Sequence, residues 1–290
     1  MSHAATVEAK AIARGARVAH NSAQMAVGTM VSRALGFVRV MLLALCLGVA
    51  LPNDAFSIAQ GLPQFLFVII STGAVTAVFV PQITKAMARA DGGEDFINRL
   101  MTLALLFLAG CTVLAVLATP WLTDLMVSDA ADAQAAGYLQ LATLLAYWCI
   151  PQLPFYGLFA VLGQVLNARG SFRAFAWAPA LANVVQVAAL GLFYWVWGYQ
   201  GDVATFTPMM AAVLGGGATL GIAVQALVLL PPLLRDGFRF KLRFGWRGMG
   251  FGAITKMTAW AVAAVSLTMV MNFVISWALT AARGGLDDVL

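Results

Sequence analysis

Six long stretches without a single charged residue most constrain what this chain can fold into. Each contains at least 24 residues, whereas about 20 apolar residues suffice for a helix to cross a hydrocarbon core of roughly 30 Å. None shows the alternation of apolar and polar residues that is typical of membrane-barrel strands, so we predict membrane-spanning helices. The stretches are residues 55–84, 100–123, 133–168, 174–201, 203–234 and 257–282.

The composition excludes several other classes of protein. The chain is 62% hydrophobic and only 10% charged, with a mean hydropathy of +0.88, far from the values of a soluble domain. A water-soluble enzyme, a nucleic-acid-binding module and a disordered chain are therefore excluded. All three cysteines fall in apolar stretches, and the two histidines, His3 and His20, precede them. We expect no disulfide framework, no metal site and no cofactor.

The distribution of charge among the loops predicts the orientation of the helices. A seventh apolar segment, residues 24–50, precedes the six stretches. Alternate loops hold 14 of the 17 lysines and arginines, while the loops between them hold aspartates and no base. Because cytoplasmic loops collect lysine and arginine, we predict seven membrane-spanning helices with a cytoplasmic N-terminus. The base-rich loops contain Lys10, Arg14 and Arg17; Lys85, Arg89 and Arg99; Arg169 and Arg173; and Arg235, Arg239, Lys241, Arg243, Arg247 and Lys256.

Two arginines interrupt the first helix, and they are the candidate binding residues. A charged side chain at the bilayer centre costs about 2.5–3.5 kcal/mol unless it faces water or a partner. Arg33 can lie at the cytoplasmic border and extend its side chain to the headgroups. Arg39 lies about 9 Å deeper along the helix, and the 14 charge-free residues that follow it are too few to span the membrane. Since guanidinium grips phosphate bidentately, an anionic substrate is expected.

Asp54 and a pair of glycines each support two interpretations, and the prolines and the basic linker support one. Asp54 follows Pro52 and opens the second helix, either as its N-cap or as a counter-ion or gating residue for the two arginines. Prolines within the helices predict kinks of the kind that surround a cavity. Gly217 and Gly221 form a GxxxG pattern that favours close helix packing or a hinge. The bases of residues 239–244 are expected to touch anionic headgroups.

A series of short motifs occurs in a fixed order along the chain. They are residues 31–39 (VSRALGFVR), 54–56 (DAF), 62–63 (LP), 73–74 (GA), 79–81 (FVP), 166–167 (LN) and 178–183 (APALAN). This series resembles the N-terminal half of the MurJ (MviN) lipid II flippases, which belong to the multidrug/oligosaccharidyl-lipid/polysaccharide exporter superfamily.

The resemblance implies a fold, a substrate and site residues. It implies the first lobe of a two-lobe exporter plus the first helix of the second lobe, and hence a truncated chain. Arg33 and Arg39 match family arginines that line a cationic cavity for the pyrophosphate head group, and Asp54 matches the family's aspartate. The chain departs from the family at Phe67 and Val68, where the second helix of the family has an arginine pair.

We therefore expect an all-α, multi-pass protein of the bacterial plasma membrane that moves lipid-linked peptidoglycan precursor to the outer leaflet by alternating access, without catalysis. Its expected partners are a lipid-linked oligosaccharide, membrane lipids and a missing second lobe or partner subunit, and no nucleic acid. The predicted regions are a cytoplasmic tail (1–23), a six-helix lobe (24–234), a basic cytoplasmic linker (235–256), a seventh helix (257–282) and an extracytoplasmic end (283–290).

Three other functions fit parts of the pattern. An exporter of drugs or of another polyprenyl-linked glycan fits the helices equally well. A scaffold for cell-wall synthesis that transports nothing fits the departures from the family. A membrane enzyme fits less well, because the predicted helices hold no histidine, acid pair or metal cluster.

Overall fold

The computed structural model describes residues 2–71, 94–126, 133–235 and 240–245. All regular elements in these ranges are helical, which confirms the predicted all-α fold. The predicted seventh helix, the end of the chain and the second half of the 55–84 stretch lie outside the described residues. The helices are α1 (Ser2–Leu47), α2 (Leu51–Ser71), α4 (Glu94–Leu117), α5 (Thr119–Met126), α6 (Ala133–Cys149), α7 (Leu153–Ala168), α8 (Phe172–Trp197), α9 (Pro208–Leu227) and α10 (Leu230–Arg235).

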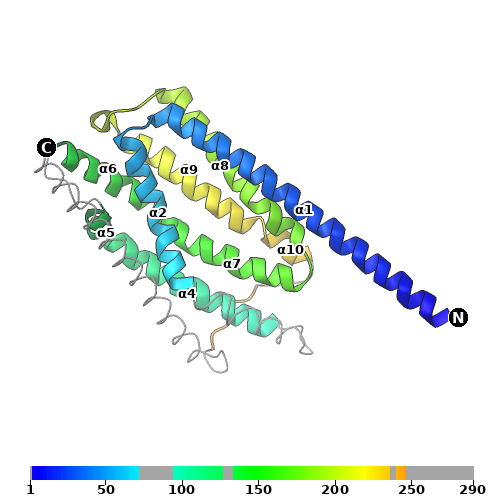
Figure 1. Ribbon diagram of the computed structural model, residues 1–290. Coiled ribbons are helices and arrows are strands. Elements are labelled where there is room, and N and C mark those ends of the chain that lie inside the picture. The colour runs from blue at the N-terminus through cyan, green and yellow to red at the C-terminus, as the bar shows by residue number, and fades with distance from the viewer. Residues whose placement is uncertain (1, 72–93, 127–132, 236–239, 246–290) are drawn as a thin grey trace, which may run out of the picture.

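Helix α1 is much longer than the predicted first span. Its 46 residues are one continuous helix, so residues 2–23 of the predicted cytoplasmic tail are helical, and the division of the chain into regions stays a prediction. Alanine-rich sequence without proline favours this continuation. In Figure 1 the N-terminal part of α1 projects beyond the rest of the bundle. The helix ends at Gly48, whose φ of +71° is readily adopted only by glycine.

Three of the predicted spans are interrupted near prolines. The 133–168 stretch divides into α6 and α7 at a single 3-10 turn, Ile150–Gln152, with Pro151 in the turn and Pro154 in the first turn of α7. This is the kink that the prolines predict, since proline lacks the backbone donor of a regular helix. The 100–123 stretch divides into α4 and α5 before Pro120, and the 203–234 stretch into a 3-10 turn, α9 and α10.

Helices α1 and α8 pack side by side and run parallel, although about 150 residues separate their sequences (Figure 1). Their contacts follow the same order along both helices. A Cβ on Gly28 would lie 2.9 Å from the backbone oxygen of Ala176, so the backbones approach closely, as small residues permit in membrane helices. The further contact pairs are Ser32 with Asn183, Arg39 with Gln186, and Cys46 with Leu190.

Helix α9 packs antiparallel to α8 through the GxxxG pattern. A Cβ on Gly217 would lie 2.4 Å from the Cβ of Ala189, and one on Gly221 would lie 2.9 Å from the carbonyl oxygen of Ala182. Both glycines therefore serve close helix packing, the first of the two interpretations of this pattern.

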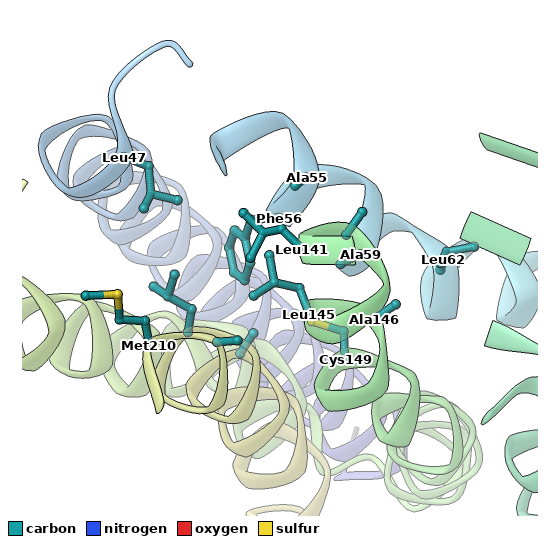
Figure 2. Packing of buried hydrophobic residues seen from close by; sticks show 14 of the residues in the cluster. Leu47, Ala55, Phe56, Ala59, Leu62, Leu141, Leu145, Ala146, Cys149 and Met210 are labelled. Atoms are coloured by element: carbon teal, nitrogen blue, oxygen red, sulfur yellow. The ribbon is translucent and has the colours of Figure 1, made fainter. Parts of the chain in front are cut away.

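Two clusters of buried apolar residues hold the bundle together at its two ends. The first joins the end of α1 to α2, α6 and the start of α9, and Figure 2 shows Phe56 and Leu145 gathered between these helices. The second joins the start of α4 to the end of α7, the start of α8 and α10. It includes Ile97, Leu166 and Leu233, none of which is exposed to solvent.

Charge separates along the bundle as the loop pattern predicts. We call the end formed by the second cluster the basic end, because six bases lie there. Arg99, Arg169, Arg173 and Arg235 lie in or next to helices that begin or end there, and the backbone of Lys241 and Arg243 is bonded to Asn98 and Thr102 near the start of α4. The opposite, acidic end carries Asp54, Asp124 and Asp202. The basic end also holds Asp95, which pairs with Arg99 at 2.7 Å and with Arg243 at 3.7 Å.

Five of the described helical segments are long and apolar enough to cross a membrane. They are Ala23–Leu47, Glu94–Leu117, Gly137–Asn167, Phe172–Trp197 and Pro208–Arg235. The total of seven spans and the cytoplasmic N-terminus stay predictions.

Candidate functional site

Arg39 lies inside the span formed by α1, where its guanidinium is held by a residue of another helix. Nη1 of Arg39 donates a hydrogen bond to Oε1 of Gln186 on α8, at 2.6 Å. Gln186 is 5% exposed, and Arg39 is half-buried. At about 1.5 Å per residue, Arg39 lies about 12 Å from the end of the span at Leu47. Among the described residues no carboxylate pairs with Arg39, so its positive charge is available to an anion.

A narrow cavity opens beside Arg39 and Gln186. Its volume is about 20 Å³, room for about one water molecule. Apolar side chains make most of its wall, and the remaining polar group is the carboxamide of Gln60 on α2. The lining residues are Arg39, Leu43, Phe56, Gln60, Gln186, Ala189, Leu190, Leu214 and Ala218. Four helices thus surround one cation and two amides, which together can donate hydrogen bonds to an anionic group.

A second polar pair lies next to this cavity, at the break between α6 and α7. The hydroxyl of Tyr156 donates to Oε1 of Gln152 at 3.1 Å, and Tyr156 interacts electrostatically with Arg39. Gln152 is fully buried, and its Nε2 has no partner among the described residues. Phe67, which stands where the family resemblance places an arginine, stacks on the ring of Tyr156 with centroids 5.8 Å apart.

Asn183 fixes α8 against α1 between these groups and the basic end. Its Nδ2 lies 2.9 Å from the backbone oxygen of Ser32 and 3.2 Å from its Oγ. Ser32 belongs to the 31–39 motif and Asn183 to the 178–183 motif. Two motifs that are far apart in the sequence therefore form one interface, and this interface sets the register that brings Arg39 opposite Gln186.

Arg33 lies on the same helix but not in this cavity. Its side chain is exposed, and none of the described residues forms a hydrogen bond or ion pair with it. Six residues of helix turn its side chain about 120° away from that of Arg39. The structure does not bring the two arginines together, and the role of Arg33 stays a prediction.

Asp54 lies near the acidic end, exposed, in the first turn of α2. It is not the N-cap that one interpretation expected, because the helix already begins at Leu51. A carboxylate in the first turn still interacts favourably with the helix dipole. It interacts electrostatically with Tyr138 of α6. Its role as counter-ion or gating residue stays a prediction.

Four of the polar residues in and around the cavity were not predicted as site residues from the sequence. Gln60, Gln152, Tyr156 and Gln186 carry no charge, whereas the predicted site consists of charged residues. An amide in a helix that crosses lipid is itself a signal, because it needs a hydrogen-bond partner there.

The fold and this polar cluster define a class: a polytopic α-helical membrane protein whose helix bundle holds a cation that pairs with no carboxylate of the described residues. The sequence profile of the family described as Lipid II flippase MurJ matches residues 43–286. The chain belongs to this family. This match confirms the resemblance seen in the sequence motifs. Together with the candidate spans it also confirms the predicted localisation as a multi-pass protein in the bacterial plasma membrane.

Individual proteins named as lipid II flippases are also similar to this chain in sequence. The chain is 28% identical over 253 residues to a probable lipid II flippase MurJ of Vibrio cholerae, with 83% of this chain and 46% of the relative covered. It is 29% identical over 253 residues to the corresponding protein of Haemophilus influenzae, with 83% and 47% covered. A lipid II flippase MurJ of Burkholderia cenocepacia is 28% identical over 208 residues, with 71% and 38% covered.

The chain spans about half the length of these relatives. The family match begins at residue 43, so it includes Asp54, Gln60 and Gln186 but neither Arg33 nor Arg39. The relatives are named for a transport function and not for a catalysed reaction.

Proposed function

We propose that this chain forms one lobe of a flippase that moves lipid II from the inner to the outer leaflet, with Arg39 as the residue that meets the pyrophosphate. The observation that carries the proposal is the guanidinium of Arg39, half-buried within a candidate membrane span, whose hydrogen bond among the described residues goes to the neutral amide of Gln186. A bond to a neutral amide orients the cation without neutralising it. The full charge is then left for the substrate.

The chemistry of the cluster suits a pyrophosphate with a sugar attached. Arg39 offers further N–H donors beyond the one that Gln186 accepts, and a guanidinium matches the geometry of phosphate oxygens. The amides of Gln60 and Gln186 supply donors and acceptors for hydroxyl groups. The cavity of about 20 Å³ is too small for such a head group, so the substrate would meet Arg39 from its exposed side, and Arg33 and Asp54 would act nearer the two membrane surfaces.

A second lobe would complete the site. The chain spans about half the length of its relatives, and exporters of this kind bind their substrate near the midplane between two structural repeats that rock against each other. We propose that the exposed side of Arg39 faces such a lobe, supplied by a longer chain or by a partner subunit, and that alternating access arises from the movement between the lobes.

Binding of lipid II to residues 1–290 in lipid nanodiscs tests the assignment of Arg39. Native mass spectrometry would compare lipid II with undecaprenol, which has the lipid tail but no pyrophosphate. We expect lipid II to bind, and Arg39→Gln to lower its affinity about tenfold or more, since a charge-assisted hydrogen bond to phosphate is worth about 1.5–3 kcal/mol. Lys241→Gln is the matched control, because it removes one positive charge outside the cavity.

Two results would overturn the proposal. Equal binding of undecaprenol and lipid II would remove the pyrophosphate as the recognised group. Equal affinity of the parent chain and Arg39→Gln for lipid II would remove Arg39 from the site. The need for a second lobe is tested separately in proteoliposomes, where residues 1–290 alone are expected not to move fluorescent lipid II across the bilayer.

A further inference from the structure

A second cavity lies at the basic end of the bundle, separate from the one beside Arg39. Its volume is about 620 Å³, within the range of about 300–1,000 Å³ that is usual for small-molecule sites. It opens between the start of α8 and the end of α10, as the helices that supply its lining residues show. Its lining residues are Ser171, Arg173, Ala174, Trp177, Pro232 and Arg235, and none of them lines the cavity of Arg39.

Two arginines from different helices line this second cavity. Arg173 lies in the first turn of α8 and Arg235 is the last residue of α10, and both side chains are exposed. Within the described part of the chain, neither guanidinium pairs with a carboxylate. Two unpaired guanidiniums beside one cavity attract an anion, and phosphate is the anion whose oxygens both can grip bidentately.

Ser171 adds a neutral donor to the two cations. It is the N-cap residue of α8, but its side chain makes no capping hydrogen bond. Since its hydroxyl makes no such bond within the described part of the chain, it can donate to a phosphate oxygen beside Arg173.

The remaining wall of the cavity is apolar and lies at the ends of two candidate membrane spans. Trp177 follows Arg173 by four residues, so it lies on the same face of α8, and it is 37% exposed. Tryptophan is enriched at the boundary between membrane and water. The candidate span of α8 begins at Phe172 and the one that includes α10 ends at Arg235. In a bilayer that these spans cross, both arginines would lie at the level of the phosphates of one leaflet.

We infer that this cavity binds the phosphate of an anionic phospholipid, whose acyl chains stay in the bilayer beside Trp177 and Pro232. A soluble phosphate would gain the contacts of the two arginines, but nothing from the apolar wall at the edge of the span. The site is separate from the proposed lipid II site, and neither depends on the other.

Native mass spectrometry of residues 1–290 tests the inference. The protein would be released from nanodiscs that contain equal amounts of phosphatidylglycerol and phosphatidylcholine, and the retained lipids would be counted. We expect one phosphatidylglycerol to be retained in preference to phosphatidylcholine, and the double variant Arg173→Gln with Arg235→Gln to lower its affinity about tenfold or more. The double variant Lys241→Gln with Arg243→Gln removes the same charge from the same end, outside the cavity, and is expected to keep that lipid.

Three outcomes would overturn the inference. Unchanged retention in the Arg173/Arg235 variant would remove these residues from the site. Equal loss in both double variants would mean that the basic end attracts anionic lipid only through its overall charge. The ligand would be a soluble phosphate if inorganic phosphate at millimolar concentration displaced phosphatidylglycerol and raised the melting temperature of the protein as much as phosphatidylglycerol does. All four substituted side chains are exposed, so both variants are expected to fold, as helical circular dichroism would verify.

Discussion

Gly221 of α9 lies directly against Gln186 of α8. A Cβ on Gly221 would lie 2.7 Å from Cγ and 2.8 Å from Nε2 of Gln186, closer than carbon atoms normally approach. The carboxamide of Gln186 can therefore lie where it does only because Gly221 has no side chain. Oε1 of this carboxamide accepts the hydrogen bond from Arg39. A glycine in α9 thereby sets the position of a cation in α1 that it does not touch.

Gly221→Ala is therefore expected to weaken lipid II binding without altering any polar group. The added methyl group must move Gln186 or part α9 from α8, and overpacking of this kind costs about 1–3 kcal/mol. We expect lower affinity for lipid II by native mass spectrometry and a lower melting temperature.

Gly191→Ala is the matched control, because nothing lies within 4 Å of a Cβ at Gly191. It is expected to leave lipid II affinity unchanged and, as a change from glycine to alanine inside a helix, to leave stability equal or slightly higher. Parent-like binding in Gly221→Ala would mean that Gln186 does not orient Arg39.

Much of the fold follows from the charge pattern of the sequence. Apolar stretches without charge predict helices because lipid offers no partner for an unpaired backbone, and the described helices lie within or near these stretches. The prolines also predicted the break between α6 and α7. The sequence did not predict the helical continuation of α1 to Ser2, because a polar, alanine-rich segment is compatible with both a tail and a helix.

The site was predictable only in part. Arg39 could be identified because burying its charge is costly wherever no partner is found. Gln186 could not be paired with it, because 147 residues separate them and only the packing of α1 on α8 decides which amide lies opposite. The separation of Arg33 from the cavity also depends on this packing. Helical period gives the angle between two side chains of one helix but not the neighbour that each side chain meets.

The bond between Asn183 and Ser32 is expected to contribute to the stability of the α1–α8 interface. Asn183→Ala removes both contacts of Nδ2, with Ser32 O at 2.9 Å and Ser32 Oγ at 3.2 Å, and it should lower the free energy of unfolding by about 1–2 kcal/mol. Ser32→Ala removes only the hydroxyl and leaves the backbone acceptor, so its effect should be smaller. Steric trapping in bilayers measures both values. A larger loss in Ser32→Ala than in Asn183→Ala would contradict the assignment.

The segment 240–245 is held on α4 through its backbone. The N–H of Lys241 donates to Oδ1 of Asn98 at 3.0 Å, and that of Arg243 donates to Oγ1 of Thr102 at 3.2 Å. Asn98→Leu removes one acceptor, which should lower the free energy of opening of the segment by about 1 kcal/mol. The rate of tryptic cleavage after Lys241 should then rise about fivefold. Mass spectrometry of the detergent-solubilised protein follows the cleavage.

Thr112→Val serves as the control for this cleavage experiment, because the hydroxyl of Thr112 bonds only to Leu108 of its own helix among the described residues. Its cleavage rate should match that of the parent chain. Equal rates in Asn98→Leu and the parent would mean that the bond from Lys241 does not limit opening of the segment.

The separation of charge between the two ends predicts which end faces the cytoplasm. Ala204 lies at the acidic end and Leu242 at the basic end, and both are exposed. Because basic loops stay in the cytoplasm, a membrane-impermeant maleimide should label Ala204→Cys in intact cells and Leu242→Cys only after the cells are opened. The parent chain is the blank, since Cys46, Cys111 and Cys149 lie within candidate spans. Labelling of Leu242→Cys in intact cells, with Ala204→Cys protected, would reverse the orientation and place the phosphate cavity of Arg173 and Arg235 in the outer leaflet.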